Sequence, residues 1–487
     1  MQEVKYCLAY TAPTAKILVC LCDGILPEAV PSAGGGASSG PRKIIRAGER
    51  LAFGALRDPR NDTVLVAAGG RAMKKTIRFM AETLAEYWWV GLCFLFLSLI
   101  VHLTVDKLML FFNTDGNSPA PALKAVVFYV SALALFMPIA KDTWKIWREA
   151  TWRDILAPFA VALGVMAVSM ALTFQRGPLA LGVDYSLRSE SPFTQISDWQ
   201  NTRLLMPALS YLFFLRGTWP FYVFFLALTF LFIAMLYSWT RAHAPLSLWE
   251  FLSLCTASFV VYQFQIPGYP DILVFIFFLL VMRSDFGPAA KLSALLLGLI
   301  AFESSFIVGL VLAWKYLPRK EQVIYLLAIG IYGLVWLAVW NVDVAAILSS
   351  RNVEGMSGLE WVRAHPSLEI FGVLAAFKAL WVVMLWAASS AFPLKRSEAA
   401  FILIVIGAGI LMTFSAVDTS RLMGYAFPAL LVSLAVLKES ASNRTGRLVL
   451  AFLFAVNLLI PSVYVGLNSG MRTFRGLYGR AVRWLVP

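Results

Sequence analysis

Long apolar segments recur along this chain and limit what it can fold into. Most of them approach the roughly 20 residues that a helix needs to cross a bilayer. Backbone polar groups cannot stay unpaired in lipid, and the alternation of a barrel strand is absent, so these segments are predicted to be helices. We expect an all-α polytopic membrane protein with about 11–13 transmembrane helices. The apolar segments are 88–112, 123–140, 155–174, 219–240, 247–264, 271–283, 291–314, 322–341, 367–391, 399–416, 421–437 and 447–468.

Composition excludes two other classes of protein. The chain is 60% hydrophobic and only 14% charged. A water-soluble globular protein does not need so many apolar residues. The net charge of +13 would suggest nucleic acid in a soluble protein, but here the positive residues gather in short loops, as in polytopic membrane proteins. We therefore expect no nucleic-acid partner. The five cysteines form neither a metal-type nor a disulfide pattern.

The first 72 residues differ from the rest. They include the low-complexity stretch "PSAGGGASSGPRK", and "MKKTIRF" at Met73 is typical of the start of a membrane protein. We expect residues 1–72 to be disordered or to come from a mis-assigned start codon, and 73–487 to form a single integral membrane domain.

Positive loops predict the orientation. Residues 141–153, 315–321, 393–398 and 438–447 are short and basic, so they and the N-terminus are expected in the cytoplasm, with 175–218 outside. This orientation requires two non-spanning pieces: a short helix at 203–215 along the outer surface, and a helical hairpin at 291–315 that turns near Glu303. Segments 265–271, 341–367 and 416–421 are then also outside, and the cations expected inside are Arg241, Arg283, Lys291 and Lys315.

The polar segment 182–207 holds the first candidate site residues. Asp184 could act as a general base toward a hydroxyl or hold a divalent metal, and Asp198 and Glu190 compete for that role. A solvated loop acid is the alternative. Arg203 could bind a phosphate with two hydrogen bonds, or extend to lipid head groups.

Charged residues inside apolar segments are the second set of candidates. Glu303 lies in "LIAFESSFIVG" and Lys378 in "AAFKALWVV", so they could pair with each other, or Lys378 could contact a phosphate head group. In "SAVDTSRLMGYAFP", Asp418 could cap the next helix, and Arg421 could bind an anionic lipid-linked donor or anchor the interface. The three histidines are too scattered for a metal site, and no phosphate-binding glycine loop occurs.

The order of these features resembles the GT-C class of multi-pass membrane glycosyltransferases, in its bacterial mannosyltransferase-like and cell-surface polysaccharide branch. The resemblance covers 154–437 and rests on "GVDY", "TRLLMPALSYLFFLRG", "MLYSWTRAH", "ALLLGLIAFESSFIVGLVLAW" and "DTSRLMGYAFPALL" in sequence. The sequence departs from the class pattern in three ways: two spans precede the one that leads to the Asp loop, the loop Asp is single, and no large soluble C-terminal domain follows.

What the resemblance implies is an inverting transferase in the bacterial inner membrane, with its active site facing the periplasm. Its donor would be a polyprenyl-phosphate sugar, and its acceptor a glycan or a lipid-linked molecule. Asp184 would be the base, with Asp198 as the other catalytic candidate, and some members of the class use a divalent cation (Mg²⁺ or Mn²⁺). The substrate-binding residues would be Arg203, Glu303, Lys378, Asp418 and Arg421.

Other functions stay open at this point. An O-antigen-type polymerase would favour arginine-dense outer loops, whereas the loops here mix both signs. A transporter or flippase predicts interrupted spans and inverted repeats, and the sequence has one interrupted run and no evident repeat. A structural scaffold would leave Glu303 and Lys378 without a purpose.

Overall fold

The computed structural model describes residues 7–12, 15–20, 59–102, 120–172, 182–193, 203–339, 358–392, 395–414, 418–440, 444–465 and 472–473. The chain divides into two units, Met1–Ile77 and Arg78–Pro487. In the first unit, β1 (Cys7–Ala12) and β2 (Ala15–Cys20) form an antiparallel pair. Most of the other residues up to 58 lie outside the description, so the expectation for 1–72 stays a prediction.

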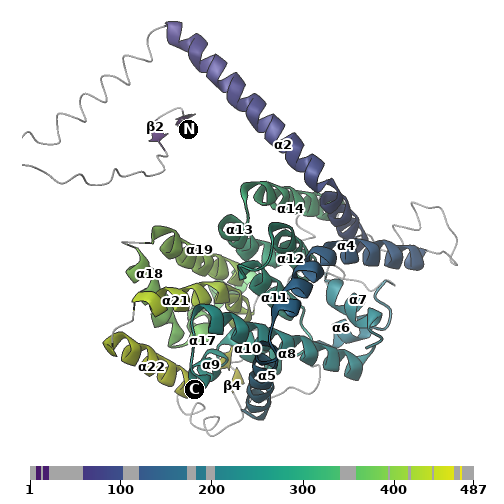
Figure 1. Cartoon of the computed structure of the whole chain (residues 1–487), viewed down its shortest axis with the longest axis vertical. Coiled ribbons are helices and arrows are strands. Elements are labelled where there is room, and N and C mark those ends of the chain that lie inside the picture. Colours follow the sequence, from purple (N-terminus) through teal and green to yellow (C-terminus); the bar gives the residue numbers. More distant parts are fainter. Residues whose placement is uncertain are drawn as a thin grey trace, which may run out of the picture. The chain divides into compact units, whose positions relative to one another are not determined.

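The second unit is built from helices apart from the short pair β3 (Val463–Tyr464) and β4 (Arg472–Thr473). Helix α2 (Pro59–His102) leads into it (Figure 1). The other helices are α4 (Ala120–Glu149), α5 (Trp152–Leu172), α6 (Val183–Arg188), α7 (Leu205–Leu212), α8 (Thr218–His243), α9 (Leu248–Leu254), α10 (Ser258–Gln265), α11 (Asp271–Met282), α12 (Pro288–Ala301), η2 (Glu303–Ser305), α13 (Phe306–Tyr316), α14 (Arg319–Val339), α16 (Gly358–Ala364), α17 (Pro366–Phe377), α18 (Leu380–Ala391), α19 (Arg396–Thr413), α20 (Thr419–Met423), η3 (Gly424–Ala426), α21 (Phe427–Ser440) and α22 (Arg444–Leu459).

Long apolar helices make the chain an all-α polytopic membrane protein. Within the described residues, seven helices are long and apolar enough to cross a membrane, or eight if the bent pair α17–α18 is one span. This is fewer than the 11–13 expected from the sequence. The difference arises where apolar runs are broken: 247–264 divides into α9 and α10, and 271–283 forms the 12-residue α11, which is short for a crossing.

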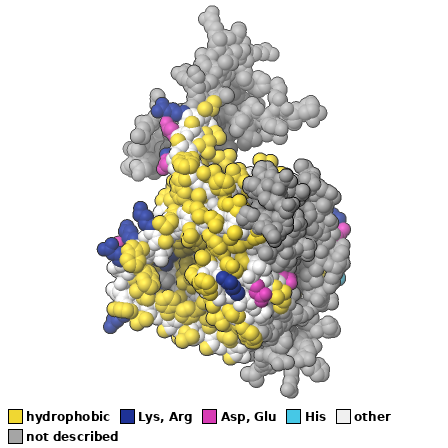
Figure 2. All heavy atoms as spheres, turned by 90° about the vertical axis from the view of Figure 1, so that its right-hand side faces the viewer, with side chains coloured by type: hydrophobic (Ala, Val, Ile, Leu, Met, Phe, Trp, Pro, Cys, Tyr) yellow, Lys and Arg dark blue, Asp and Glu magenta, His cyan; other side chains and the backbone are white. Residues whose placement is uncertain are grey.

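Burial separates a central group of helices from those around it. Every residue of α11 is buried, and so is most of the stretch from α20 to α21. In helices α5 and α14, by contrast, only 22% and 28% of the apolar window is buried. Figure 2 shows a face on which hydrophobic side chains dominate and charged ones gather in few places. Such a surface suits contact with lipid tails rather than water.

The α12–α13 pair is a hairpin, as the sequence predicted. The two helices meet at the tip formed by η2, which begins at Glu303. Their far ends also meet, because Nζ of Lys291, near the start of α12, lies 5.9 Å from the ring of Tyr316, the last residue of α13. At 1.5 Å per residue neither arm reaches the ~30 Å of a hydrocarbon core. The hairpin therefore enters and leaves at one end of the helix bundle.

Helix α7 is the short helix predicted at 203–215, but it does not lie on the surface. Leu204, Leu205, Met206 and Ala208 are fully buried. The reason is that α7 packs against α6, α8 and α12. A non-spanning helix in a membrane protein needs such surroundings.

Cationic helix ends gather where the hairpin arms end. An ion pair of 2.6 Å between Lys315 and Glu398 joins the end of α13 to the start of α19. A second pair, Lys395 with Glu439, joins α19 to the end of α21. The ends of α8 and α11 line one groove with the end of α4. We call this end the rim; its cations include Arg241, Arg283, Lys291, Lys315 and Lys395.

Exposed tryptophans accompany the rim. Trp144, Trp147 and Trp152 lie where α4 ends and α5 begins, and all three are exposed. Trp219 is exposed at the start of α8, about 33 Å along that helix from Arg241. Tryptophan is enriched at both membrane–water boundaries, and this separation matches a hydrocarbon core of ~30 Å.

Candidate functional site

Two buried arginines meet three carboxylates at the end of the second unit away from the rim. Glu303 is at the hairpin tip, and Asp271 begins α11, whose other end carries Arg283. Arg203 directly precedes α7, and Arg421 is in α20. We call Arg203, Arg421, Glu303, Asp271 and Asp418 the two-arginine cluster. Segments 265–271 and 416–421, which were predicted to share one side with 175–218, therefore do come together.

Arg203 forms a bidentate pair with Glu303. Its Nη2 and Nε lie 2.9 and 3.1 Å from the two carboxylate oxygens, and its Nη1 donates to the Tyr185 hydroxyl at 3.2 Å. Burial lowers the pKa of Arg203, but the Glu303 charge and Tyr185 raise it more, so the net pKa lies above its ordinary value. The guanidinium is thus always charged, and it holds the hairpin tip against α6 and α7.

Arg421 lies between two carboxylates. Its Nη1 is 3.1 Å from Oδ2 of Asp271, and its Nη2 is 3.0 Å from Oδ2 of Asp418. Each aspartate also accepts a phenol hydrogen bond, from Tyr425 and Tyr464 respectively. The Arg421 side chain is 4% exposed and that of Asp271 0%. The cluster therefore contains two arginines and three carboxylates. Arg203 pairs with one carboxylate, and Arg421 is shared by the other two.

Both arginines lie over the same ring. The guanidinium carbons of Arg203 and Arg421 are 4.2 and 5.6 Å from the centre of Phe302, and Arg421 is also 4.6 Å from Tyr269. Cation–π contacts of this kind strengthen when water is excluded. The ring holds the two cations side by side although they come from distant parts of the sequence.

Two buried donors, one on Arg421 and one on Tyr262, have no partner among the residues that the structure describes. The Nε of Arg421 and the hydroxyl of Tyr262 are buried without a hydrogen-bond acceptor. The Arg421 guanidinium carbon is 5.8 Å from the Tyr262 ring, so both donors belong to one place. Buried donors nearly always have partners, and exceptions point to water, an ion or a ligand. An oxyanion would satisfy both.

Helix α6 carries Asp184 one residue before Tyr185, which contacts the cluster. The Asp184 side chain is exposed, whereas the next residue, Tyr185, is buried against Arg203. Gly182 makes this position possible: a Cβ there would lie 2.4 Å from the carbonyl oxygen of Pro267. The other predicted acid, Asp198, lies outside the described residues.

Two predicted roles are corrected by the structure. Glu303 does not pair with Lys378, because it is bound to Arg203. Lys378 instead lies at the 78° bend between α17 and α18, with φ of 50°, and its Nζ donates to Thr256 Oγ1, Ile460 O and Ser462 Oγ at 2.8–3.1 Å. Lys378 therefore fixes the bend and is not part of the two-arginine cluster.

Asp418 occupies the N-cap position of α20, but its side chain makes no capping hydrogen bond. The carboxylate turns instead to Arg421 and Tyr464. Burial, followed by the charge of Asp418 and its hydrogen bond, raises the pKa of Tyr464, so this phenol stays a donor. Because a charge-assisted hydrogen bond to Arg421 is stronger than a capping hydrogen bond to a backbone N–H, the Asp418 carboxylate forms the ion pair.

Several residues of the site were not predicted from the sequence. Asp271 was placed on the correct segment but given no role, although a carboxylate directly before eleven apolar residues is an unusual helix start. The tyrosines that contact the cluster, and Phe302, could not be recognised in the sequence, because nothing near them distinguishes them from aromatic residues of the core. Among the residues that the structure describes, no group of three or more His, Cys, Asp or Glu is placed to hold a metal ion.

Comparisons with known proteins add no further assignment. The chain matches no protein-family model, and neither the curated proteins nor the solved structures gave a match.

Proposed function

We propose that this chain is an integral membrane glycosyltransferase that moves a sugar from a polyprenyl-phosphate donor to an extracytoplasmic acceptor in cell-surface glycan assembly. The observation that supports it is the meeting of Arg203 and Arg421 over Phe302, together with an exposed carboxylate at Asp184, one residue before the Tyr185 that contacts Arg203. A lipid-phosphate donor needs cations for its phosphate and a base for the acceptor hydroxyl.

In this proposal the two arginines have different roles. Arg421 Nε and the Tyr262 hydroxyl, which lack partners, donate to the donor phosphate. Arg203 is engaged by Glu303 and Tyr185, so it positions the hairpin tip. Asp184 takes the proton of the acceptor hydroxyl; the oxygen then bonds to the anomeric carbon, and polyprenyl phosphate leaves with the bonding electrons.

The proposed location is the bacterial inner membrane, with the rim in the cytoplasm and the two-arginine cluster toward the periplasm. The gathering of cationic helix ends at the rim supports it, because cytoplasmic loops carry the excess of Lys and Arg.

The sharpest test uses Asp184, because its side chain is exposed and its replacement should not disturb folding. Membranes with Asp184→Asn and a radiolabelled polyprenyl-phosphate hexose should transfer sugar about 10²–10⁴-fold more slowly than wild type. Glu190→Gln is the matched control: Glu190 is also exposed and lies six residues further on, and full activity is expected. Unchanged transfer by Asp184→Asn removes the base; no transfer by wild type from any such donor ends the proposal.

Arg421 is tested in the same assay. Arg421→Gln should slow transfer by roughly 10²–10³-fold, as for other lost oxyanion donors. Arg216→Gln is its control, since Arg216 is exposed and stacks on Tyr211 at 3.8 Å, outside the cluster. The size-exclusion profile separates a catalytic loss from misfolding. Products longer than one added sugar would favour a polymerase instead.

A transporter or flippase is the second candidate. It is favoured by two interrupted helical segments, the α12–α13 hairpin and the α17–α18 bend, because such breaks are typical of transporter substrate sites. Proteoliposomes decide between the two: movement of a labelled lipid-linked sugar across the bilayer without any transfer product would support transport.

A further inference from the structure

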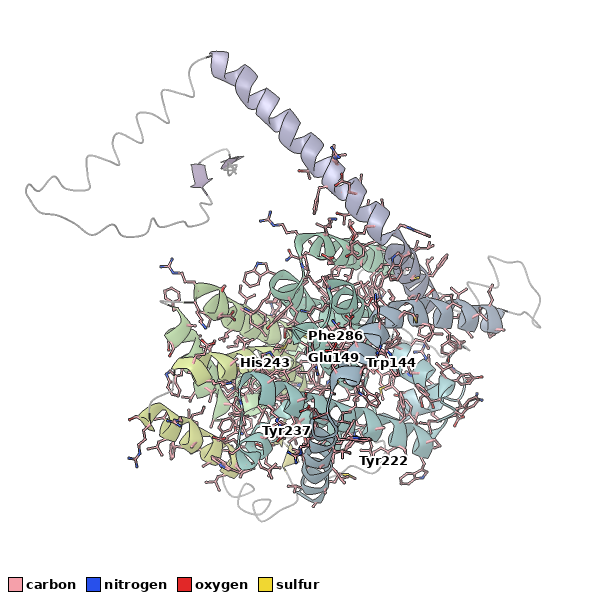
Figure 3. All side chains as sticks on the ribbon, viewed as in Figure 1. Trp144, Glu149, Tyr222, Tyr237, His243 and Phe286 are labelled. Atoms are coloured by element: carbon pink, nitrogen blue, oxygen red, sulfur yellow. The ribbon has the colours of Figure 1, made fainter. Side chains whose placement is uncertain are left out.

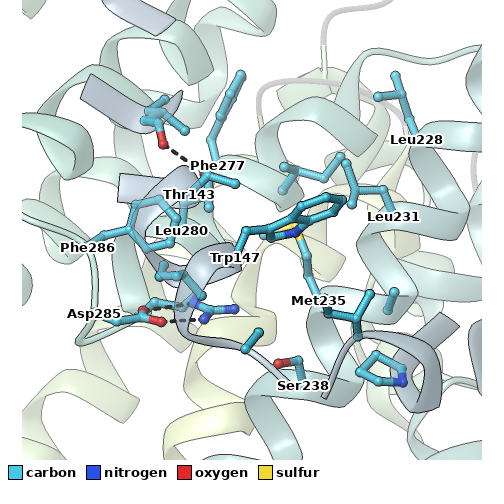
Figure 4. A pocket seen from close by; sticks show the side chains of 18 of the residues that line it. Thr143, Trp147, Leu228, Leu231, Met235, Ser238, Phe277, Leu280, Asp285 and Phe286 are labelled. Atoms are coloured by element: carbon cyan, nitrogen blue, oxygen red, sulfur yellow. Dashed lines mark hydrogen bonds and ion pairs between the residues drawn. The ribbon is translucent and has the colours of Figure 1, made fainter. Parts of the chain in front are cut away.

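A groove of about 930 Å³ lies between α4, α5, α8 and α11 and ends at the rim. Its volume is at the upper end of the ~300–1,000 Å³ common for small-molecule sites. The groove is separate from the two-arginine cluster, none of whose residues line it. Figure 4 shows the Trp147 ring directed toward Leu231 and Met235 of α8. What the groove binds is independent of the function proposed above.

The long wall of the groove is one face of α8. Phe224, Leu228, Leu231, Met235 and Arg241 line it at helical spacing. From first to last they cover about 25 Å along the helix axis, most of the ~30 Å hydrocarbon thickness. The walls are mostly apolar from Phe224 to Met235, and at the far end residues of α7 join the lining. An extended hydrocarbon chain fits this shape.

The end of the groove at the rim is charged with both signs. Arg241 and Arg283 line it, together with Glu149, Asp154 and Asp285. Arg283 Nε lies 2.9 Å from Oδ1 of Asp285. Glu149, from the end of α4, and Phe286, from the loop before α12, both line the groove and are labelled in Figure 3. Arg241, Glu149, Asp154 and Asp285 are exposed, so a head group at this end would meet water.

We propose that this groove is a binding site for a phospholipid with a zwitterionic phosphoethanolamine head group. The phosphate lies at Arg241 and Arg283, the ammonium at the surplus carboxylates, and an acyl chain follows α8. Charge complementarity selects this occupant. The charges lie at one end of the groove and have both signs, so a zwitterionic head group finds a partner for each of its own charges, whereas a head group with a phosphate alone offers no cation to Glu149 and Asp154.

The test is lipid retention by the full chain. The protein is placed in nanodiscs that contain phosphatidylethanolamine, phosphatidylglycerol and a polyprenyl phosphate, extracted in mild detergent, and examined by native mass spectrometry. Wild type should retain phosphatidylethanolamine about tenfold above its share of the bilayer, equivalent to ~1.4 kcal/mol. This measurement needs no variant, so a folding defect cannot confuse it.

Two variants locate the site. Leu231→Trp fills the groove and should abolish the retention, whereas Leu334→Trp, the same change at an exposed position of α14 outside the groove, should not. Arg241→Gln should reduce the preference for phosphatidylethanolamine, with Arg216→Gln as its control. Equal retention of the phospholipids, retention of polyprenyl phosphate, no retained lipid, or retention unaffected by Leu231→Trp would each overturn the proposal.

Discussion

The Arg203–Glu303 pair ties the residue before α7 to the tip of a hairpin a hundred positions later in the chain. Both side chains are nearly buried, so removing one partner leaves the other charge without compensation. Arg203→Met or Glu303→Gln should each destabilise the protein by about 3–5 kcal/mol. The double variant Arg203→Met/Glu303→Gln should lose clearly less than the sum. SDS-induced unfolding of the protein in mixed micelles measures all three, and additive losses would contradict the pairing.

Gly182 permits a close approach that no other residue allows. A Cβ at this position would lie 2.4 Å from the Pro267 oxygen and 2.8 Å from Gly268 Cα, both backbone atoms. Gly182→Ala should therefore cost about 1–3 kcal/mol in the same unfolding measurement, and it should lower transfer by displacing Asp184.

The control for Gly182→Ala is Gly164→Ala in α5, where nothing lies within 4 Å of the added methyl group. Alanine is the better helix former, so this change should be neutral or slightly stabilising. Equal behaviour of the two variants would mean that α6 does not pack against the 267–268 loop.

At the residue scale the sequence could identify candidates but not their partners. Arg203, Glu303 and Arg421 stand out because charges are rare in apolar surroundings. Hydropathy, however, holds no information on which carboxylate meets which arginine. Glu303 and Lys378 are both in apolar segments, and only packing shows that they contact different neighbours.

Among the elements, the α12–α13 hairpin gives the most direct prediction. Because its two arms end together, cysteines introduced at Lys291 and Lys320 should react with an impermeant thiol reagent from the same side of the membrane. The labelling uses a background in which the five native cysteines are replaced. Reaction from opposite sides would show that the segment crosses.

The break at Glu303 was predicted because a charge interrupts an apolar run there, whereas the break between α9 and α10 and the bend at Lys378 were missed. The charge of Glu303 indicates the position of the hairpin tip in the sequence. The break between α9 and α10 falls at residues 255–257, which are apolar or neutral, so hydropathy reads one run. The capping box of Ser247 and Glu250 marks where α9 begins but not where it ends. The bend at Lys378 was hidden because the residues around it are uniformly apolar.

Over the whole molecule, charge and aromatic residues divide the second unit into two ends. The rim gathers the cations predicted to share one side, with exposed tryptophans beside it. The two-arginine cluster is at the other end, where the charges are buried and paired. Positive loops predicted this division because the rule acts on the whole chain during insertion, whereas the number of spans depends on tertiary packing, and the described residues hold seven or eight candidates against the 11–13 expected.

Sidedness is the prediction on which the proposed function depends. Asp184→Cys, in the cysteine-replaced background, should react with an impermeant thiol reagent added to intact spheroplasts. Lys145→Cys, near the end of α4, should react only after permeabilisation, because its helix ends at the rim. Both positions are exposed, so a difference reports the side of the membrane and not burial. Cytoplasmic labelling of position 184 would place the carboxylate away from an extracytoplasmic acceptor and exclude Asp184 as its base.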